Sequence, residues 1–429
     1  MVERVIDVDD ARGSSPLPPT KRSFPSSGEI NMKILSIETS CDETALAVIE
    51  GSGDLKSPSF KILGTALYSQ IEIHRQFGGV FPAVAKREHA KRLVPLLTSL
   101  FQKTPLEFEK IKKENAVSPI QEKKIKDLLQ REIGLAEELL EFVRKNPKPK
   151  IDMIAVTVGP GLEPALWVGI NFAKALSLFW DIPVMPINHM EGHIVSVLTS
   201  AENLSAETDV RFPAVALLIS GGHTEIVLVE NWGKYQILGS TQDDAVGEAF
   251  DKTARLLDLP YPGGPEISKL AEKLRESETD PEIKSALEIK LPRPMINSGN
   301  YNFSFSGLKT AVLYLIKKLN EQNKLTEKIK AEIALEFENA ASEVLLNKTQ
   351  KAAQEYNAKT IILGGGVTAN KHIRRVFSEL VGPNLKVLMP QRDLSTDNAV
   401  MIGMAGFLKS FSEKPTVDPE LTAAGNLRL

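Results

Sequence analysis

Two stretches, ILSIETSCDETALAVIE at 34–50 and VALLISGGHTEIVLVE at 215–230, decide the fold. Each consists of an aliphatic and β-branched run, a small polar turn that contains threonine, and a second such run, which predicts a β-hairpin. The strands are expected over 33–37, 45–50, 214–219 and 225–230. The weak repeat suggests that each hairpin opens one half of a duplicated molecule, although any two hairpins share this general pattern.

The sequence around the hairpins alternates between strand, glycine turn and helix, which is typical of an α/β fold. The apolar run 151–158 suits a buried strand, ends in Gly159-Pro160-Gly161, and precedes a helix expected over 165–179. Further strands are expected at 182–187, 360–363 and 386–389, and further helices at 306–320, 326–356 and after Thr396.

Composition restricts the class of protein. The 429 residues suffice for two or three domains, or for one large bilobal unit. The 42% hydrophobic and 25% charged residues exclude a collagen-like, disordered or disulfide-scaffold chain. Because the formal net charge is only -3, any contact with nucleic acid requires a local patch. A single cysteine, Cys41, indicates a reducing compartment, and we expect a cytoplasmic protein without a membrane-spanning helix.

Changes in composition along the chain divide it into segments. Residues 1–31 combine acidic residues, prolines and serines, and we expect a disordered extension. An N-terminal lobe is expected over 32–210 and a C-terminal lobe over 211–429. Within the first lobe, lysine and glutamate dominate about 103–150, where leucines keep a helical spacing. We expect this segment to be a helical insertion on the surface.

One pair of histidines has a spacing that suits metal binding. His189 and His193 are four residues apart, so on a helix both imidazoles project from one face. Taken alone, a pair at this spacing is more often a hydrogen-bonded pair with no metal. Glu191 does not stand where the zinc-peptidase pattern H-E-x-x-H requires its glutamate. Asp397 stands at a predicted helix start, where it either caps the helix or supplies a hard metal ligand.

Glycine-rich turns follow two of the expected strands. The turns 220–224 and 364–366 allow backbone N–H groups to approach an anion such as phosphate. Most glycines that end strands serve only as turns, and neither segment matches the dinucleotide or P-loop pattern. Between them, the acidic residues of 243–252 either cap a helix or bind ribose hydroxyls.

Taken together, these motifs resemble the TsaD-type tRNA N6-adenosine threonylcarbamoyltransferase family, formerly described as glycoproteases, and its bacterial branch in particular. The resemblance spans about 32–410, and its motifs are 37–44, 78–92, 158–161, 188–193, 218–224, 243–252, 261–265, 302–310, 364–370 and 395–398. It implies a two-lobed actin-like or hexokinase-like ATPase (ASKHA) fold with duplicated ribonuclease H-like lobes. The extension at 1–31 and the insertion within 103–150 depart from the family pattern.

The resemblance also implies a reaction and its site. The family transfers threonylcarbamoyl from its AMP mixed anhydride to N6 of adenine 37 in tRNAs that read codons beginning with A. It implies one divalent metal, usually iron and possibly zinc, on His189, His193 and Asp397, with Glu43 assisting catalysis. The residues that would hold the adenine nucleotide are Leu218, Ile219, Ser220, Gly221, Gly222, Asp251, Gly264 and Asn370. The implied protein partners are a paralogous TsaB-type dimerisation subunit and a small TsaE-type P-loop ATPase.

A basic cluster provides a candidate contact with tRNA. It lies on a predicted helix beside a glycine-rich loop and consists of Lys86, Arg87, Lys91 and Arg92. A solvated helix face is the alternative interpretation. Two other functions also stay open, namely a non-catalytic actin-like ATPase or scaffold subunit and a metallopeptidase. The missing glutamate disfavours the peptidase, and the retention of all three metal-ligand candidates disfavours the scaffold.

Overall fold

The computed structural model describes residues 30–109, 117–199, 210–277, 289–382, 384–417 and 420–429. The extension expected at 1–31 lies outside these residues, except that the first strand already begins at Ile30. None of the helices in the described ranges has both the length and the apolar character needed to cross a bilayer.

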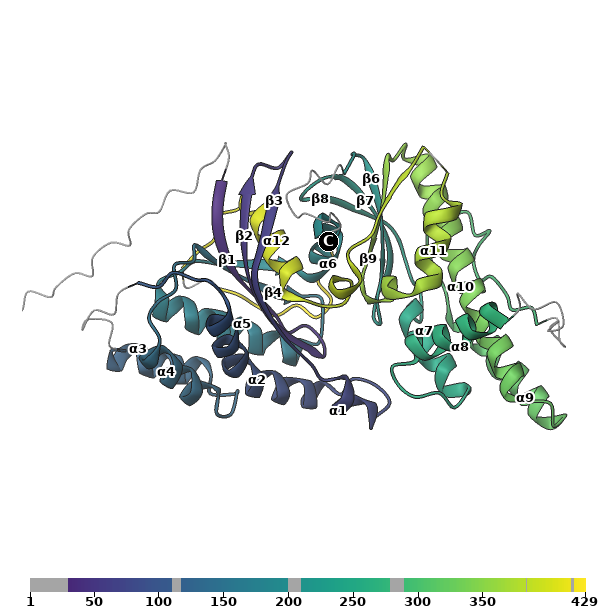
Figure 1. The fold of residues 1–429 in the computed structure, drawn as a ribbon, viewed down its shortest axis with the longest axis horizontal. Helices are drawn as coiled ribbons and strands as arrows, with labels where there is room; N and C mark the ends of the chain where they lie inside the picture. The colour runs from purple at the N-terminus through teal and green to yellow at the C-terminus, as the bar shows by residue number, and fades with distance from the viewer. Residues whose placement is uncertain (1–29, 110–116, 200–209, 278–288, 383, 418–419) are drawn as a thin grey trace, which may run out of the picture.

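Two five-stranded sheets of identical topology form the two lobes (Figure 1). The first consists of β1 (Ile30–Glu38), β2 (Glu43–Gly53), β3 (Ser59–Ser69), β4 (Met153–Gly159) and β5 (Val184–Asn188). The second consists of β6 (Ala214–Ile219), β7 (Thr224–Asn231), β8 (Lys234–Ser240), β9 (Thr360–Gly364) and β10 (Lys386–Leu388). Their spatial orders, β3-β2-β1-β4-β5 and β8-β7-β6-β9-β10, correspond strand by strand. Each begins with an antiparallel meander and continues with two parallel strands, which confirms the duplicated ASKHA-type fold.

Helices cover both sheets. The first lobe contains α1 (Ile71–Arg75), α2 (Pro82–Lys103), α3 (Pro119–Leu128), α4 (Leu135–Lys145), α5 (Glu163–Trp180) and α6 (His189–Val195). The later part of the chain contains α7 (Val246–Leu256), α8 (Gly263–Ser277), α9 (Ser306–Glu321), α10 (Glu327–Glu355), α11 (Lys371–Leu380) and α12 (Ala399–Lys409). The sequence interpretation did not anticipate β3, β8, α8 or α11, and it considered a helix near α7 only as one of two alternatives for the acidic residues of 243–252.

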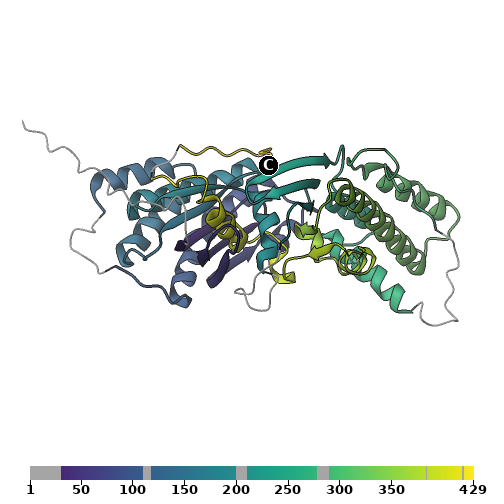
Figure 2. The ribbon, with the colours of Figure 1, turned by 90° about the horizontal axis from the view of Figure 1, so that it is seen from above.

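Alternating residues of the central strands enter different cores, as the two-residue period of a strand requires. In β6, Val215, Leu217 and Ile219 face a core formed with α7 to α11. Ala216 and Leu218 face the opposite way, into a core shared with the first sheet. Both α6 and α12 lie in this shared core between the two sheets (Figures 1 and 2). The lobes are therefore joined by buried apolar packing around the helices that begin at His189 and Ala399.

Helix α12 lies on the first sheet, although its residues belong to the segment expected as the C-terminal lobe. All of its residues from Ala399 to Leu408 are buried. Two glycines permit the close approach, because a Cβ at Gly403 would lie 2.9 Å from Ile49 and one at Gly406 would lie 2.9 Å from Ala155. The chain thus returns to the first lobe at its end and carries Asp397 with it.

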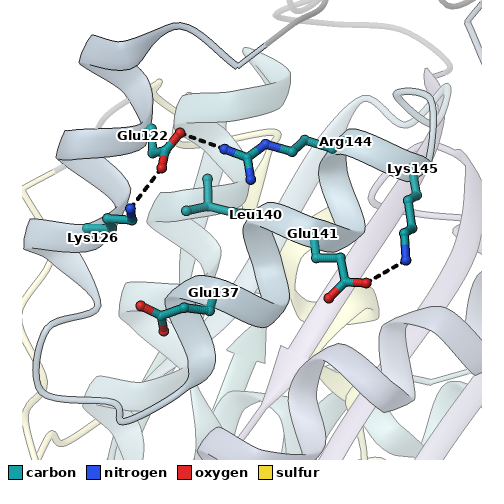
Figure 3. Close-up of a pocket in the computed structure, with 7 residues that line it drawn as sticks. All are labelled: Glu122, Lys126, Glu137, Leu140, Glu141, Arg144 and Lys145. Atoms are coloured by element: carbon teal, nitrogen blue, oxygen red, sulfur yellow. Dashed lines mark hydrogen bonds and ion pairs between the residues drawn. The ribbon is translucent and has the colours of Figure 1, made fainter.

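The described part of the segment 103–150 contains the helices α3 and α4, as expected, but it is more than a surface addition. Ile125 and Leu139, on α3 and α4, are fully buried in a core that also contains Leu97 of α2 and Phe172 of α5. A surface cavity of about 360 Å³ lies between α3 and α4 (Figure 3), and its Glu122 is paired with Lys126 and Arg144 at 2.8 and 2.5 Å. The pairs of Glu122 with Lys126 and Arg144, and of Glu141 with Lys145, neutralise most of the charge in this cavity, and we do not assign it to the chemistry considered below.

Candidate metal and catalytic site

The two histidines lie in the first turns of α6, which begins where β5 ends. The Asn188 side chain caps this helix by accepting from the backbone N–H of Met190 at 2.8 Å. The imidazoles of His189 and His193 are buried, and their ring centroids are 4.6 Å apart. The helical spacing therefore brings the two rings together, as predicted from the sequence.

Asp397 completes the cluster from the loop that precedes α12. Its Oδ1 lies 3.4 Å from His189 Nε2 and 3.2 Å from His193 Nε2. The alternative role as a helix cap belongs to the next residue, since Asn398 Oδ1 accepts from the backbone N–H of Met401 at 3.1 Å. One possible ligand atom from each of His189, His193 and Asp397 falls within 4.8 Å of the others.

Glu38, which the sequence interpretation missed, lies directly behind His189. This carboxylate ends β1, is fully buried, and has its Oε2 3.1 Å from His189 Nδ1. Thr157 Oγ1 donates to the same oxygen at 2.5 Å, and the backbone N–H of Ser40 donates to Oε1 at 2.6 Å. A carboxylate that holds Nδ1–H leaves Nε2 directed toward Asp397, which is the outer-shell arrangement found around metal-bound histidines. A buried acid inside an apolar strand was the only sequence signal for this residue.

The donor set fits a divalent metal. Two imidazole nitrogens and a carboxylate suit iron or zinc. Apart from the 3.2 Å contact with Asp397, neither ring nitrogen of the buried His193 has a polar partner among the residues that the structure describes. Burial opposes the charged form of Asp397, but the adjacent imidazoles of His189 and His193 hold the pKa of its carboxyl well below the usual range. Burial likewise opposes protonation of His189, yet Asp397 and Glu38 raise its pKa well above the usual value. The carboxylates of Asp397 and Glu38 therefore favour a positive charge between the imidazoles, either a proton or a bound cation.

The turn of the first hairpin supplies a different kind of carboxylate. Glu43 opens β2, and its Oε1 accepts from Ser69 Oγ at 3.1 Å. Burial, reinforced by the carboxylates of Asp42 and Asp397, raises the pKa of Glu43 well above the usual value. Burial also raises the pKa of the Cys41 thiol, so this cysteine stays protonated. Glu43 thus holds a proton more firmly than an ordinary glutamate does.

A buried histidine fixes this turn. His89 of α2 donates from Nε2 to the carbonyl of Cys41 at 3.0 Å, and its Nδ1 accepts from Thr44 Oγ1 at 2.7 Å. Burial lowers the pKa of His89 to about 4, so the ring is neutral in the folded protein. His89 therefore does not belong to the basic face of α2.

We expect His89 to make the protein sensitive to acid. A group with a pKa of about 4 in the folded chain and an ordinary value of 6.5 binds more protons when unfolded, so stability falls as the pH drops below about 6.5. Lowering the pH from 7 to 5 should therefore cost about 2 kcal/mol through this group. Chemical denaturation of wild type and His89→Gln at both pH values checks this. An equal loss in the two proteins would contradict it.

The residues expected to hold a nucleotide lie around the end of β6. Leu218 and Ile219 are fully buried in the strand, and the turn Ser220-Gly221-Gly222 follows. The backbone N–H of Gly247, at the start of α7, donates to the Ser220 carbonyl at 3.3 Å.

The other expected nucleotide ligands already have protein partners. Asp251 of α7 accepts from the backbone N–H of Gly263 at 2.7 Å and also from that of Gly264, and burial raises its pKa. The Asn370 side chain caps α11 by accepting from Ile373 N–H, and it donates to Glu338 Oε1 at 2.6 Å.

His223 is a second residue that the site interpretation missed. It follows the turn, and its backbone N–H donates to Ser220 Oγ at 3.0 Å. Burial lowers its pKa to about 4, and the nearby charges of His189 and His193 act in the same direction. The turn therefore lies within electrostatic reach of the histidine cluster.

The basic cluster lies on α2, and all of its members except Lys86 share one buried acid. Glu88 Oε1 is 3.0 Å from Lys91 Nζ and 3.6 Å from Arg87 Nε, and its Oε2 is 3.8 Å from Arg92. Arg92 also stacks over the Tyr68 ring at 4.1 Å. Lys86 turns toward Glu132 at 3.8 Å. One carboxylate cannot neutralise the surrounding guanidinium and ammonium groups, so the face stays positive.

A family model and curated relatives with similar sequences all carry the same description. A family model described as TsaD, tRNA N6-adenosine threonylcarbamoyltransferase, matches residues 61–113 and 123–404. The enzyme of that name from Thermosipho africanus (strain TCF52B) is 41% identical over 399 residues, which cover 93% of this chain and 100% of the relative. The one from Bacillus subtilis (strain 168) is 37% identical over 378 residues, which cover 88% and 90%. Full-length HypF in its phosphate- and nucleotide-bound form matches with a TM-score of 0.47 at 12% identity, over 90% of this chain and 57% of that one.

Proposed function

Because the chain belongs to the tRNA N6-adenosine threonylcarbamoyltransferase family, we propose that the His189–His193–Asp397 cluster and the hairpin turns beside it carry out threonylcarbamoyl transfer to tRNA. The acceptor is N6 of adenine 37, and the donor is threonylcarbamoyl-AMP. The observation that carries the assignment is the buried cluster itself, which collects two imidazoles and a carboxylate from two segments that are far apart in the sequence. The metallopeptidase and scaffold alternatives find no support in the comparisons.

A metal held by His189, His193 and Asp397, with iron as our first choice and zinc as the second, would supply Lewis acidity toward the carbamoyl carbonyl and the phosphate leaving group. Glu38 is a positioning residue for this site, because its hydrogen bond fixes the orientation of the His189 ring. Glu191 cannot serve as the base of a peptidase, since it accepts from the Tyr235 hydroxyl at 3.1 Å.

The adenine amine must lose a proton during the reaction, and a side chain of this protein can accept it. The exocyclic amine of adenine is a poor nucleophile and loses a proton as the new C–N bond forms. A carboxyl group whose pKa is raised, as that of Glu43 is, accepts this proton more readily than an ordinary glutamate. We therefore assign Glu43 as the general base.

The backbone N–H of Gly221 would hold the adenylate phosphate, since that of Ser220 donates to the His223 carbonyl at 2.9 Å and that of Gly222 to Ser220 Oγ at 3.3 Å. A Cβ placed on Gly221 or Gly222 would have no atom within 4 Å among the residues that the structure describes, so their backbone faces open space. Asp251, Gly264 and Asn370 frame the same end of the second lobe and would contact the nucleoside.

We expect Gly222→Val to separate binding from folding. The added side chain enters open space, so the free energy of unfolding should change by less than about 0.5 kcal/mol. The same side chain would occupy the approach to the neighbouring amide of Gly221, and AMP should bind about tenfold more weakly. Isothermal titration with AMP and chemical denaturation measure the two effects.

Gly365→Ala is the matched control for this prediction. Gly365 has φ +91°, and a Cβ there would lie 2.4 Å from the Ile219 carbonyl oxygen. This variant should lose about 1 to 3 kcal/mol of stability. Undiminished AMP affinity in Gly222→Val would remove the turn from the proposed nucleotide site.

The remaining parts of the proposal concern partners. Lys86, Arg87, Lys91 and Arg92 would contact the tRNA backbone. A paralogous TsaB-type subunit and a TsaE-type P-loop ATPase would assist turnover in the cytoplasm. The test of the whole function is transfer of labelled threonylcarbamoyl from its adenylate to unmodified tRNA, with these partner proteins present. Absence of transfer by folded, metal-loaded protein would refute the assignment.

A further inference from the structure

Two exposed aromatic rings lie in the loop between α1 and α2. The Phe77 and Phe81 residues are 53% and 55% exposed, and their ring centroids are 5.9 Å apart with an interplanar angle of 32°. Every other phenylalanine in the described part of the chain is buried or half-buried. Exposed apolar surface of this kind is typical of a site that binds a ligand or a partner.

The loop that carries these rings is held at the junction of the two lobes. Arg75 donates from Nε to the carbonyl of Tyr261 at 3.0 Å, and Arg255 of α7 donates to the carbonyl of Gly78 at 2.5 Å. Within the loop, the backbone N–H of Phe81 donates to His74 Nδ1 at 3.3 Å. Figure 1 shows α1 and this loop reaching from the first lobe toward α7. The rings are thus presented on a fixed support.

Hydrogen bonds connect the same loop to the turn of the first hairpin, which contains Asp42 and leads into Glu43. The backbone N–H of Gln70, which precedes α1, donates to the carbonyl of Asp42 at 2.9 Å, and Ser69 holds Glu43. Burial, together with the charges of Asp42 and Asp251, raises the pKa of the Tyr261 phenol well above its usual value. The exposed rings therefore border the region that contains the proposed general base.

The charges around the rings favour nucleic acid over protein. Arg75 and the exposed Arg255 lie on one side of the loop, and α2, which begins directly after Phe81, presents Arg87 with 65% of its side chain exposed. Only Glu72, which pairs with Arg75 at 2.8 Å, opposes them on α1. Aromatic faces next to cations are typical of surfaces that bind unpaired nucleobases and their phosphates, whereas the cores of protein interfaces are depleted of charge.

We propose that Phe77 and Phe81 form a stacking platform for unpaired nucleobases next to the target adenosine of tRNA. This inference rests on the proposed function. An adenosine whose N6 must reach a buried base and metal cluster has to leave its stack, which costs free energy and exposes the faces of its neighbours. Rings at the edge of the site restore stacking for a displaced neighbour, while the cations hold the phosphates.

The test compares Phe77→Ala/Phe81→Ala with Phe77→Tyr/Phe81→Tyr in the full-length protein. Binding of unmodified tRNA transcript should be about tenfold weaker, or more, in the alanine variant and near wild type in the tyrosine variant. KM for tRNA should rise with little change in kcat, and the slope of log Kd against log salt should stay the same, because no phosphate contact is lost. Ile120→Ala/Ile133→Ala, at positions 71% and 93% exposed on and beside α3, is the matched control and should leave tRNA binding unchanged.

Several results would overturn the platform. Wild-type tRNA affinity in the folded alanine variant would refute it directly. Wild-type tRNA affinity combined with lost binding of the TsaB-type or TsaE-type protein would make the rings a protein interface instead. Absence of transfer by the wild-type protein would count against the proposed function, whereas the tRNA dissociation constants would still decide the platform.

Discussion

Replacing His193 by alanine is expected to remove the bound metal and to slow threonylcarbamoyl transfer about a thousandfold or more. His193 is fully buried, its Nε2 lies 3.2 Å from Asp397 Oδ1, and its ring has no other polar partner in the described part of the chain. The only polar contact that the substitution removes among these residues is therefore the one to the proposed metal ligand Asp397. Metal content per chain, measured by elemental analysis, and single-turnover transfer to unmodified tRNA are the two readouts.

Two further variants make this result interpretable. His193→Gln keeps most of the side-chain volume, so loss of metal in it cannot be assigned to a cavity alone. His372→Ala alters a histidine on α11, outside the cluster, and should keep the full metal content. If His193→Ala and His193→Gln both retain one metal per chain, the cluster is not the metal site.

The architecture was predictable because the hairpins carry strong local signals. Residues 34–37 and 45–49 are almost continuously apolar, and β1 and β2 are buried on both faces in the structure. Strands β3 and β8 were missed. Their side chains are largely half-buried or exposed, and in the β3 sequence SFKILGTALYS the apolar residues do not alternate regularly with polar ones. Sequence pattern thus located the centre of each sheet but not its antiparallel edge.

The site was predictable only where its geometry is local. The pairing of His189 and His193 follows from helical spacing, and both rings come together as expected. The role of Asp397 depends on the return of α12 to the first lobe, and no local signal could distinguish that role from helix capping by Asn398. The position of Glu38 beside the cluster depends on the pairing of β1 with β4, which also brings Thr157 to the Glu38 carboxylate. Tertiary packing, rather than local sequence propensity, therefore determines where Asp397 and Glu38 lie.

The segment 103–150 shows an error of another kind, because a partly buried segment was expected to lie on the surface. Its many charged residues suggested a surface segment, yet one apolar stripe on α4, which includes Leu139 and Leu140, is buried against the first lobe. High overall charge did not reveal this face, because an amphipathic helix can bury one narrow side and expose the rest.

Glu43→Gln is expected to lower kcat/KM about a hundredfold or more and to change the pH profile. The ionised carboxylate is the form that accepts the N6 proton, and its pKa is raised by burial and by Asp42 and Asp397. Wild-type activity should therefore rise with pH through this raised pKa and fall as the carboxyl becomes protonated in acid. The amide cannot titrate, so this part of the acidic limb should be absent from the variant. Single-turnover rates from pH 5 to 9 provide the measurement.

Asp42→Asn provides the decisive counterpart to Glu43→Gln. Asp42 is the neighbouring carboxylate that raises the pKa of Glu43, so its neutralisation should lower that pKa and move the acidic limb toward lower pH. The base itself is retained, and activity at alkaline pH should stay near the wild-type value. A structural role for the turn would lower activity at every pH without moving the limb. An unmoved limb in Asp42→Asn, together with an unchanged profile in Glu43→Gln, would exclude Glu43 as the base and leave proton removal to water or to another group near the cluster.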